Sequence, residues 1–186
     1  MNRNVPKAEL AERVARLVPE VFILAENSAL RAIRSVQWLG WLGRRPAIKQ
    51  LSKVKLEFLG FSFFYLDYQV FRCMGADVRD EFMDDLVLFA LHGVTDGMDE
   101  GEAEDQRRWF VRLVNTHTHL YAQYDKVLTG PHETPDGTAL WWFSVYLLQT
   151  IEGHALNQRH RAKVYEVALE CTKSLDTLLA DTLPPV

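Results

Sequence analysis

The stretch LEFLGFSFFYLDYQVF, from Leu56 to Phe71, determines the fold that this chain can adopt. It contains no proline, and its only charged residues are Glu57 and Asp67. Apolar residues recur along it at steps of three and four, the spacing of one face of an α-helix, and two such faces are present. The first holds Leu51, Val54, Phe58, Phe61, Tyr65 and Tyr68, and the second holds Leu56, Leu59, Phe63, Leu66, Val70 and Cys73. Because a helix that is apolar on most sides is covered by other elements, the sequence predicts a central, nearly all-apolar helix over about 47–74.

The sequence before this stretch predicts one or two amphipathic helices. An apolar stripe of heptad-like spacing begins at Leu10, and a second stripe continues to Val36. Pro19 interrupts the first stripe, where it either kinks a single helix or begins a new one in its first turn. The segment GWLGRRP, at 40–46, then separates this region from the central helix, because glycine and proline disfavour helical backbone.

The sequence after the central helix predicts four more helices. Gly75 is expected to end the central helix, and Asp77 is expected to cap the next one, which fades at His92 and Gly93. The later helices are expected over about 103–128, over 138–153 with Thr138 as the cap, and over about 161–180. No segment alternates with the period of two that a strand requires.

The patterns together predict an all-α fold, a single-domain antiparallel bundle of about six helices over residues 1–186. Short flexible ends are expected at about 1–6 and 182–186. The chain has 186 residues, 48% hydrophobic and 25% charged, which suffices for a substantial core.

We expect a cytoplasmic protein that does not enter a membrane. Cys73 and Cys171 are far apart and fall on apolar stripes, which indicates free thiols in a reducing compartment. The charged N-terminal segment lacks the apolar region of a secretory signal. Glu57 and Asp67 would be costly in lipid, so the central helix is expected in a protein core.

Charge is distributed unevenly along the chain. The range 27–56 holds seven basic residues and no acidic one, whereas 77–105 holds eleven acidic residues and Arg79 alone as a base. Such a charge separation steers a charged partner, or it lets neighbouring helices complement each other within the fold. The net charge is −4 and the isoelectric point is about 5.9, which makes nucleic acid an unlikely partner.

The segment DEFMDD, from Asp80 to Asp85, is the first candidate for chemistry. On a helix, Asp80 and Glu81 each lie about one turn from Asp84, so the three carboxylates can share a magnesium ion. DEFMDDLVLFALHG resembles the second metal-binding helix of the all-α nucleoside triphosphate pyrophosphohydrolases, a family that includes the dimeric dUTPases. The resemblance implies a Mg-dependent hydrolase of nucleotides or other phosphate compounds. That family carries Glu-x-x-Glu on the partner helix, where the preceding helix here offers Glu57. An acidic helix start that complements the helix dipole is the simpler interpretation.

Four polar residues in apolar surroundings are candidates for a buried polar cluster: Glu57, Asp67, His117 and Glu152. His117 falls on an apolar helical line, and a buried histidine needs a hydrogen-bond partner. We expect a pair with Asp67 or Glu152, either as a structural contact or as part of a metal or acid–base site. No carboxylate is followed by histidine three residues later, as a di-iron bundle requires.

Aromatic residues supply the candidates for a ligand site or an interface. Trp142 and Tyr146 lie one turn apart on an aromatic-rich helix and indicate either a small-molecule pocket or a contact with another protein. Trp38 and Trp41 lie within the basic run, next to glycines, and either help it to meet phosphates of a partner or plug the turn between two helices. An apolar or aromatic small molecule would suit a pocket between helices.

The sequence holds no complete catalytic set: no phosphate loop, nucleophile elbow, zinc CxxC pair or HExxH. We therefore expect a non-catalytic helical protein that binds a protein partner or itself, of the adaptor, immunity or regulatory type, and that needs no cofactor. The alternatives are the Mg-dependent hydrolase and a helical bundle that senses a small molecule.

Overall fold

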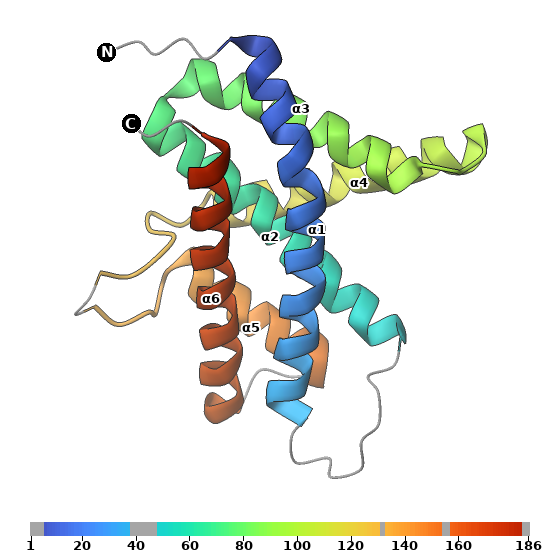
Figure 1. Ribbon diagram of the computed structural model, residues 1–186. Helices are drawn as coiled ribbons and strands as arrows, with labels where there is room; N and C mark the ends of the chain where they lie inside the picture. The colour runs from blue at the N-terminus through green and yellow to red at the C-terminus, as the bar shows by residue number, and fades with distance from the viewer. Residues whose placement is uncertain (1–5, 38–47, 131–132, 154–156, 184–186) are drawn as a thin grey trace.

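The computed structural model describes residues 6–37, 48–130, 133–153 and 157–183. Within these residues the chain forms helices and no strand, as the apolar periodicity predicts (Figure 1). The helices are α1 (Lys7–Gln37), α2 (Ile48–Met74), α3 (Ala76–Thr95), α4 (Glu100–Tyr121), α5 (Ala139–Glu152) and α6 (Gln158–Thr182). The all-α prediction is confirmed.

Helix α2 is the centre of the fold. It packs against each of the five other helices. Its residues 58–66 are all buried. For more than two turns, therefore, the helix is covered on every side. Burying a phenylalanine side chain contributes about 1.5–3 kcal/mol, and Phe58, Phe61 and Phe63 are fully enclosed. The predicted central helix is therefore confirmed, together with its bounds.

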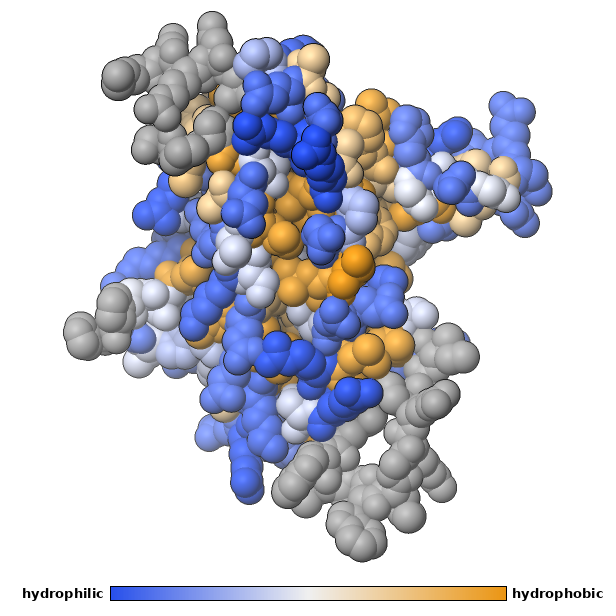
Figure 2. Space-filling model, in the orientation of Figure 1, coloured by the Kyte–Doolittle hydropathy of each residue, from blue (hydrophilic) through white to orange (hydrophobic). Residues whose placement is uncertain are grey.

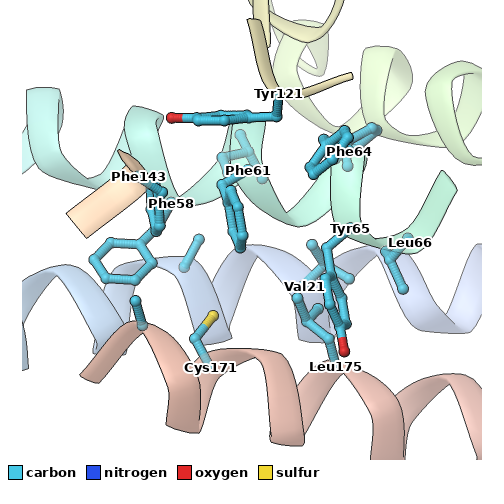
Figure 3. Packing of buried hydrophobic residues seen from close by; sticks show 14 of the residues in the cluster. Val21, Phe58, Phe61, Phe64, Tyr65, Leu66, Tyr121, Phe143, Cys171 and Leu175 are labelled. Atoms are coloured by element: carbon cyan, nitrogen blue, oxygen red, sulfur yellow. The ribbon is translucent and has the colours of Figure 1, made fainter. Parts of the chain in front are cut away.

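Stacked aromatic rings join α2 to α4 and α5. The rings of Phe61 and Phe143 are parallel, with centroids 4.1 Å apart. Tyr121 meets Phe61 edge-on at 5.3 Å, and Phe58 meets Phe143 edge-on at 5.2 Å. In Figure 3 the Tyr121 ring lies over Phe61, with Phe64 on the opposite side from Phe143. Such offset and edge-on contacts add to the free energy that burial alone supplies.

The other helices surround α2 in two groups. Helices α1 and α6 lie side by side and run in opposite directions, and α2 crosses behind them (Figure 1). Helices α3 and α4 form a hairpin that extends away from α6, and α5 packs on α2 and α6. Figure 2 shows the face formed by α1 and α6, where hydrophilic residues predominate and hydrophobic residues reach the surface mainly in the middle.

Helix α1 and the start of α3 decide two expectations about the first half of the fold. Pro19 lies inside a single continuous α1, so of the two alternatives the uninterrupted helix is correct. Asp77 does not cap α3: the cap residue is Gly75, with φ of 85°, and no side chain bonds the free N–H groups there. Glycine can both end α2 and precede α3 at this junction, because a residue without a Cβ adopts a positive φ without strain.

The predicted end of one helix in the second half was wrong, and the starts of two helices lie three residues before the predicted ones. Helix α4 begins after the cap Asp99 and ends at Tyr121, seven residues before the expected end. Helix α6 begins after the cap Asn157 and continues to Thr182. The cap at Thr138 is confirmed, since its side chain accepts a hydrogen bond from the Trp141 N–H.

No helix in the described part of the chain holds an apolar segment long enough to cross a membrane.

Candidate functional site

Large aromatic side chains gather on a continuous surface where α2 ends, α4 ends and α5 passes. We call Tyr68, Phe71, Tyr124, Trp142 and Tyr146 the aromatic face. Phe71, Trp142 and Tyr146 are 57%, 40% and 37% exposed. The surface is continuous because Tyr68, Phe71 and Tyr124 line one pocket, and Tyr124 stacks on Trp142 with ring centroids 6.2 Å apart. Tyr146 follows Trp142 by one turn of α5.

The segment after α4 holds Tyr124 in place. This segment turns back on itself, and the N–H groups of Ala139 and Leu140 donate to the carbonyls of Lys126 and Val127 at 2.9 and 3.1 Å. Val127 is 3% exposed and anchors the segment in the core. These bonds attach residues 126–127 to the start of α5. Tyr124 is therefore held between the end of α4 and this attachment.

A pocket of about 580 Å³ opens within this surface, between α2, α3 and the end of α4. This volume is in the range of roughly 300–1,000 Å³ that is typical of small-molecule sites. Its aromatic walls are Phe64, Tyr68, Phe71, Tyr121 and Tyr124, and its charged residues are Asp67, Arg79 and Asp80. The pocket therefore combines a largely aromatic wall with one charged edge.

The charged edge is an ion pair that bridges α2 and α3. Arg79 Nε and Nη2 donate to the two carboxylate oxygens of Asp67 at 2.5 and 3.0 Å, and Nη1 donates to Asp80 Oδ1 at 2.8 Å. The Asp67 side chain is 14% exposed, and Arg79 supplies the opposite charge that a mostly buried carboxylate needs. Hydrogen bonds to Asp67 and then to Asp80 raise the pKa of the Arg79 guanidinium above its ordinary value. All three nitrogens are engaged, and the edge keeps one more negative than positive charge.

A second polar cluster lies beside the aromatic face, centred on His117. Its ring is held by the Leu113 carbonyl, 3.0 Å from Nδ1, and by Glu57 Oε2, 2.9 Å from Nε2. A backbone carbonyl only accepts, so Nδ1 carries a hydrogen, and the second contact requires a further proton between Nε2 and the carboxylate. The ring lies directly on α2, because a Cβ at Gly60 would be 2.5 Å from His117 Cγ.

Tyr121 borders both the pocket and the His117 cluster. Its ring lines the pocket, and its centroid is 5.9 Å from that of His117. Its hydroxyl is buried and has no hydrogen-bond partner within the described residues. Burial, and then the nearby Glu57 and Tyr146, raise the pKa of Tyr121 well above its usual range. The hydroxyl therefore stays neutral, and its donor and acceptor are both unused inside the core.

The structure separates the four predicted buried polar residues into three pairs. His117 pairs with Glu57, so the expected pairs of His117 with Asp67 or Glu152 were wrong. Glu152 Oε1 instead lies 2.5 Å from His160 Nδ1, and Asp67 binds Arg79. Arg79 and His160 were not expected as partners from the sequence. Arg79 was visible as the only base in the acidic run, and His160 lay just beyond the apolar helix that carries Glu152.

The carboxylates of the acidic helix are engaged separately. Asp80 accepts from Arg79, Glu81 Oε1 lies 3.2 Å from Lys7 Nζ, and Asp84 is exposed. Glu57, on the preceding helix, is bound to His117. Among the described residues, no three His, Cys, Asp or Glu side chains are grouped so that they could hold a metal ion.

Trp142 and Tyr146 are brought together by α5 as their spacing predicts, and Tyr124 joins them. Trp38 and Trp41 lie outside the described residues. Comparison of the chain with protein-family models, with curated proteins and with solved structures gives no match.

Proposed function

We propose that this protein is a non-catalytic binding protein of the cytoplasm that recognises a basic segment of another protein through the aromatic face. The observation that carries the proposal is that Phe71, Trp142 and Tyr146 are exposed on one continuous surface, which Tyr124 joins by stacking on Trp142. Protein interfaces are enriched in such aromatic anchors, and most of their binding free energy comes from a few of them. Two free cysteines fit a reducing compartment.

The charge around the aromatic face selects the partner. Asp67 and Asp80 outnumber Arg79 at the pocket, and the carboxylate of Glu57 lies partly exposed near Tyr121. On α3, Asp77 adds a further exposed negative charge, which offsets that of Arg72 in the last turn of α2. A basic segment with apolar side chains complements both the charge and the rings, whereas an acidic segment is repelled.

Binding to designed peptides tests the proposal. Three labelled amphipathic helical peptides share one apolar face and differ only in their polar face, which is basic, neutral or acidic. We expect the basic peptide to bind most tightly, with an affinity that falls as salt is added, because exposed charges are screened. Trp142→Ala is expected to weaken binding by about 1–2 kcal/mol, within the range of interface anchor residues.

Ile23→Ser is the matched control, because Ile23 is 54% exposed on α1 and lies outside the aromatic face. Equal binding of the acidic and basic peptides, or equal losses for Trp142→Ala and Ile23→Ser, would contradict the proposal. Sedimentation of the protein alone separates self-association from partner binding. A dimer that Trp142→Ala dissociates would mean that a second copy, not a basic segment, covers this surface.

A further inference from the structure

We propose that the pocket between α2, α3 and α4 binds an organic cation, an alkylammonium or guanidinium group carried on an apolar stem. The inference rests on the proposed function, because it takes the aromatic face as the binding surface. It goes further by naming the chemical group of the partner that the pocket binds. Within that surface the pocket of about 580 Å³ is large enough for a long basic side chain or a small organic ion.

The aromatic wall is the first argument. Rings from three elements converge on the pocket: Phe64, Tyr68 and Phe71 from α2, Tyr121 from α4, and Tyr124 from the segment that follows it. The face of an aromatic ring is negative and attracts a cation that approaches within about 6 Å. The same rings cover the apolar stem of the ligand, so both parts of an organic cation find a favourable contact.

The charged edge is the second argument. Asp67 and Asp80 supply two carboxylates, and Arg79 neutralises one of them. Asp80 is the more accessible of the two, with 67% of its side chain exposed against 14% for Asp67. An entering cation therefore meets Asp80 at the edge, while Asp67 is held in place by both of its oxygens.

The same edge disfavours an anion. A carboxylate or phosphate would need Arg79, and three of its five N–H groups already donate to the carboxylates of Asp67 and Asp80, which also repel an anion. The start of α3, at Ala76, also lines the pocket, and a helix start attracts anions. Asp77 and Asp80 lie in and next to its first turn and offset that attraction. The aromatic rings add no positive charge, so the cation is the favoured ligand.

Titration of the full chain with four small probes, followed by amide NMR shifts, tests the inference. N-acetyl-arginine amide is compared with N-acetyl-citrulline amide, which has nearly the same shape without the charge. Benzyltrimethylammonium and benzoate provide a free organic cation and an anion. We expect both cations to shift amides at 76–80 and 118–124 in a saturable manner, and citrulline and benzoate to bind several-fold more weakly. Tighter binding of the arginine probe points to a side chain of the partner as the source, and tighter binding of benzyltrimethylammonium points to a free small molecule.

Two variants and one control locate the site. Asp80→Asn is expected to weaken binding of both cations roughly two- to fivefold without changing the citrulline probe, since it removes an exposed and partly screened charge. Phe71→Leu keeps the site apolar but removes a ring, and a similar loss is expected. Asp84→Asn is the control, because Asp84 is exposed one turn further along α3 and does not line the pocket.

The inference is overturned if benzoate binds as well as the cations, if Asp84→Asn matches Asp80→Asn, or if no probe saturates. In any of these cases, binding of the basic peptide that still depends on Trp142 would leave the proposed function standing. Conversely, binding of cations in the pocket without any Trp142-dependent binding of peptide would overturn the proposed function alone.

Discussion

At the scale of single residues, Gly60 shows how a missing side chain shapes the region beside the aromatic face. It lies among the buried residues of α2, where alanine would ordinarily favour the helix. The His117 ring occupies the space that a Cβ would fill, and it reaches Glu57 only from that position. The glycine is therefore explained by packing and not by backbone conformation.

Gly60→Ala is expected to lower the free energy of unfolding by about 1–3 kcal/mol, despite the better helix propensity of alanine, because three atoms of a buried ring lie within 2.8 Å of the new Cβ. Gly93→Ala is the matched control: Gly93 is also helical, and nothing lies within 4 Å of its Cβ. We expect it to stabilise the protein by about 0.5–1 kcal/mol. Urea unfolding measures both, and equal effects of the two changes would contradict the packing argument.

Cys171 is expected to make the protein sensitive to alkaline pH. Burial raises the pKa of this thiol from its usual 9.0 to about 11. Between these values the folded state keeps a proton that the unfolded state has lost, so the free energy of unfolding falls as pH rises. The loss from this thiol is about 2 kcal/mol between pH 8 and pH 10.5.

Urea unfolding at both pH values checks this, with Cys171→Ala as the comparison. Buried tyrosines titrate in both proteins, so only the difference between the two pH dependences reports the thiol. If the protein and Cys171→Ala showed the same pH dependence, the Cys171 thiol would have the same pKa in the folded and unfolded states, which would contradict the prediction. A thiol reagent provides an independent check, because exposed Cys73 should react in the native protein and Cys171 only on unfolding.

At the scale of elements, the junction of α2 and α3 positions the charged edge of the pocket. Gly75 lets the chain change direction within one residue, and Arg79 then reaches back to Asp67. The ion pair thus fixes the angle between the two helices that form two walls of the pocket.

Arg79→Met is expected to lower the free energy of unfolding by about 1 kcal/mol at neutral pH, because it leaves the mostly buried Asp67 carboxylate without its cation. The estimate allows for solvent screening, since the Arg79 side chain is 37% exposed. Adding Asp67→Asn to this variant should recover most of the loss, because the unpaired charge is then gone. Thermal or urea unfolding of the two single variants and the double variant gives the coupling. Additive losses would mean that the ion pair does not hold the junction.

The position of each helix could be predicted from the sequence. The exact ends of several helices and the partners of the buried polar side chains could not. The two apolar faces of 51–73 were enough to place α2, because no other element buries all of its sides. The end of α4 was misplaced because Tyr124 and Val127 continue the apolar spacing, although they pack from a segment that turns back on α5. The partner of His117 could not be chosen from the sequence, since the packing of α4 on α2 at Gly60 decides it.

At the scale of the whole molecule, the fold explains why an aromatic surface remains exposed. Helix α2 buries most of its own rings by packing against all five other helices, and its last turns, with Phe71, extend beyond this cover. The acidic residues of α3 lie beside that end, whereas Lys49 and Lys53 lie near the start of α2. The charge separation along the sequence therefore places more negative than positive charge next to the aromatic face, where Asp67, Asp77 and Asp80 outnumber Arg72 and Arg79.

Amide hydrogen exchange with and without the basic amphipathic peptide tests the central claim, that a basic partner covers the aromatic face. We predict slower exchange on binding in 66–74, 122–128 and 141–149, and unchanged exchange in 160–182 of α6, with no effect from the acidic peptide. Protection confined to α1 and α6, or the same protection from both peptides, would contradict the account.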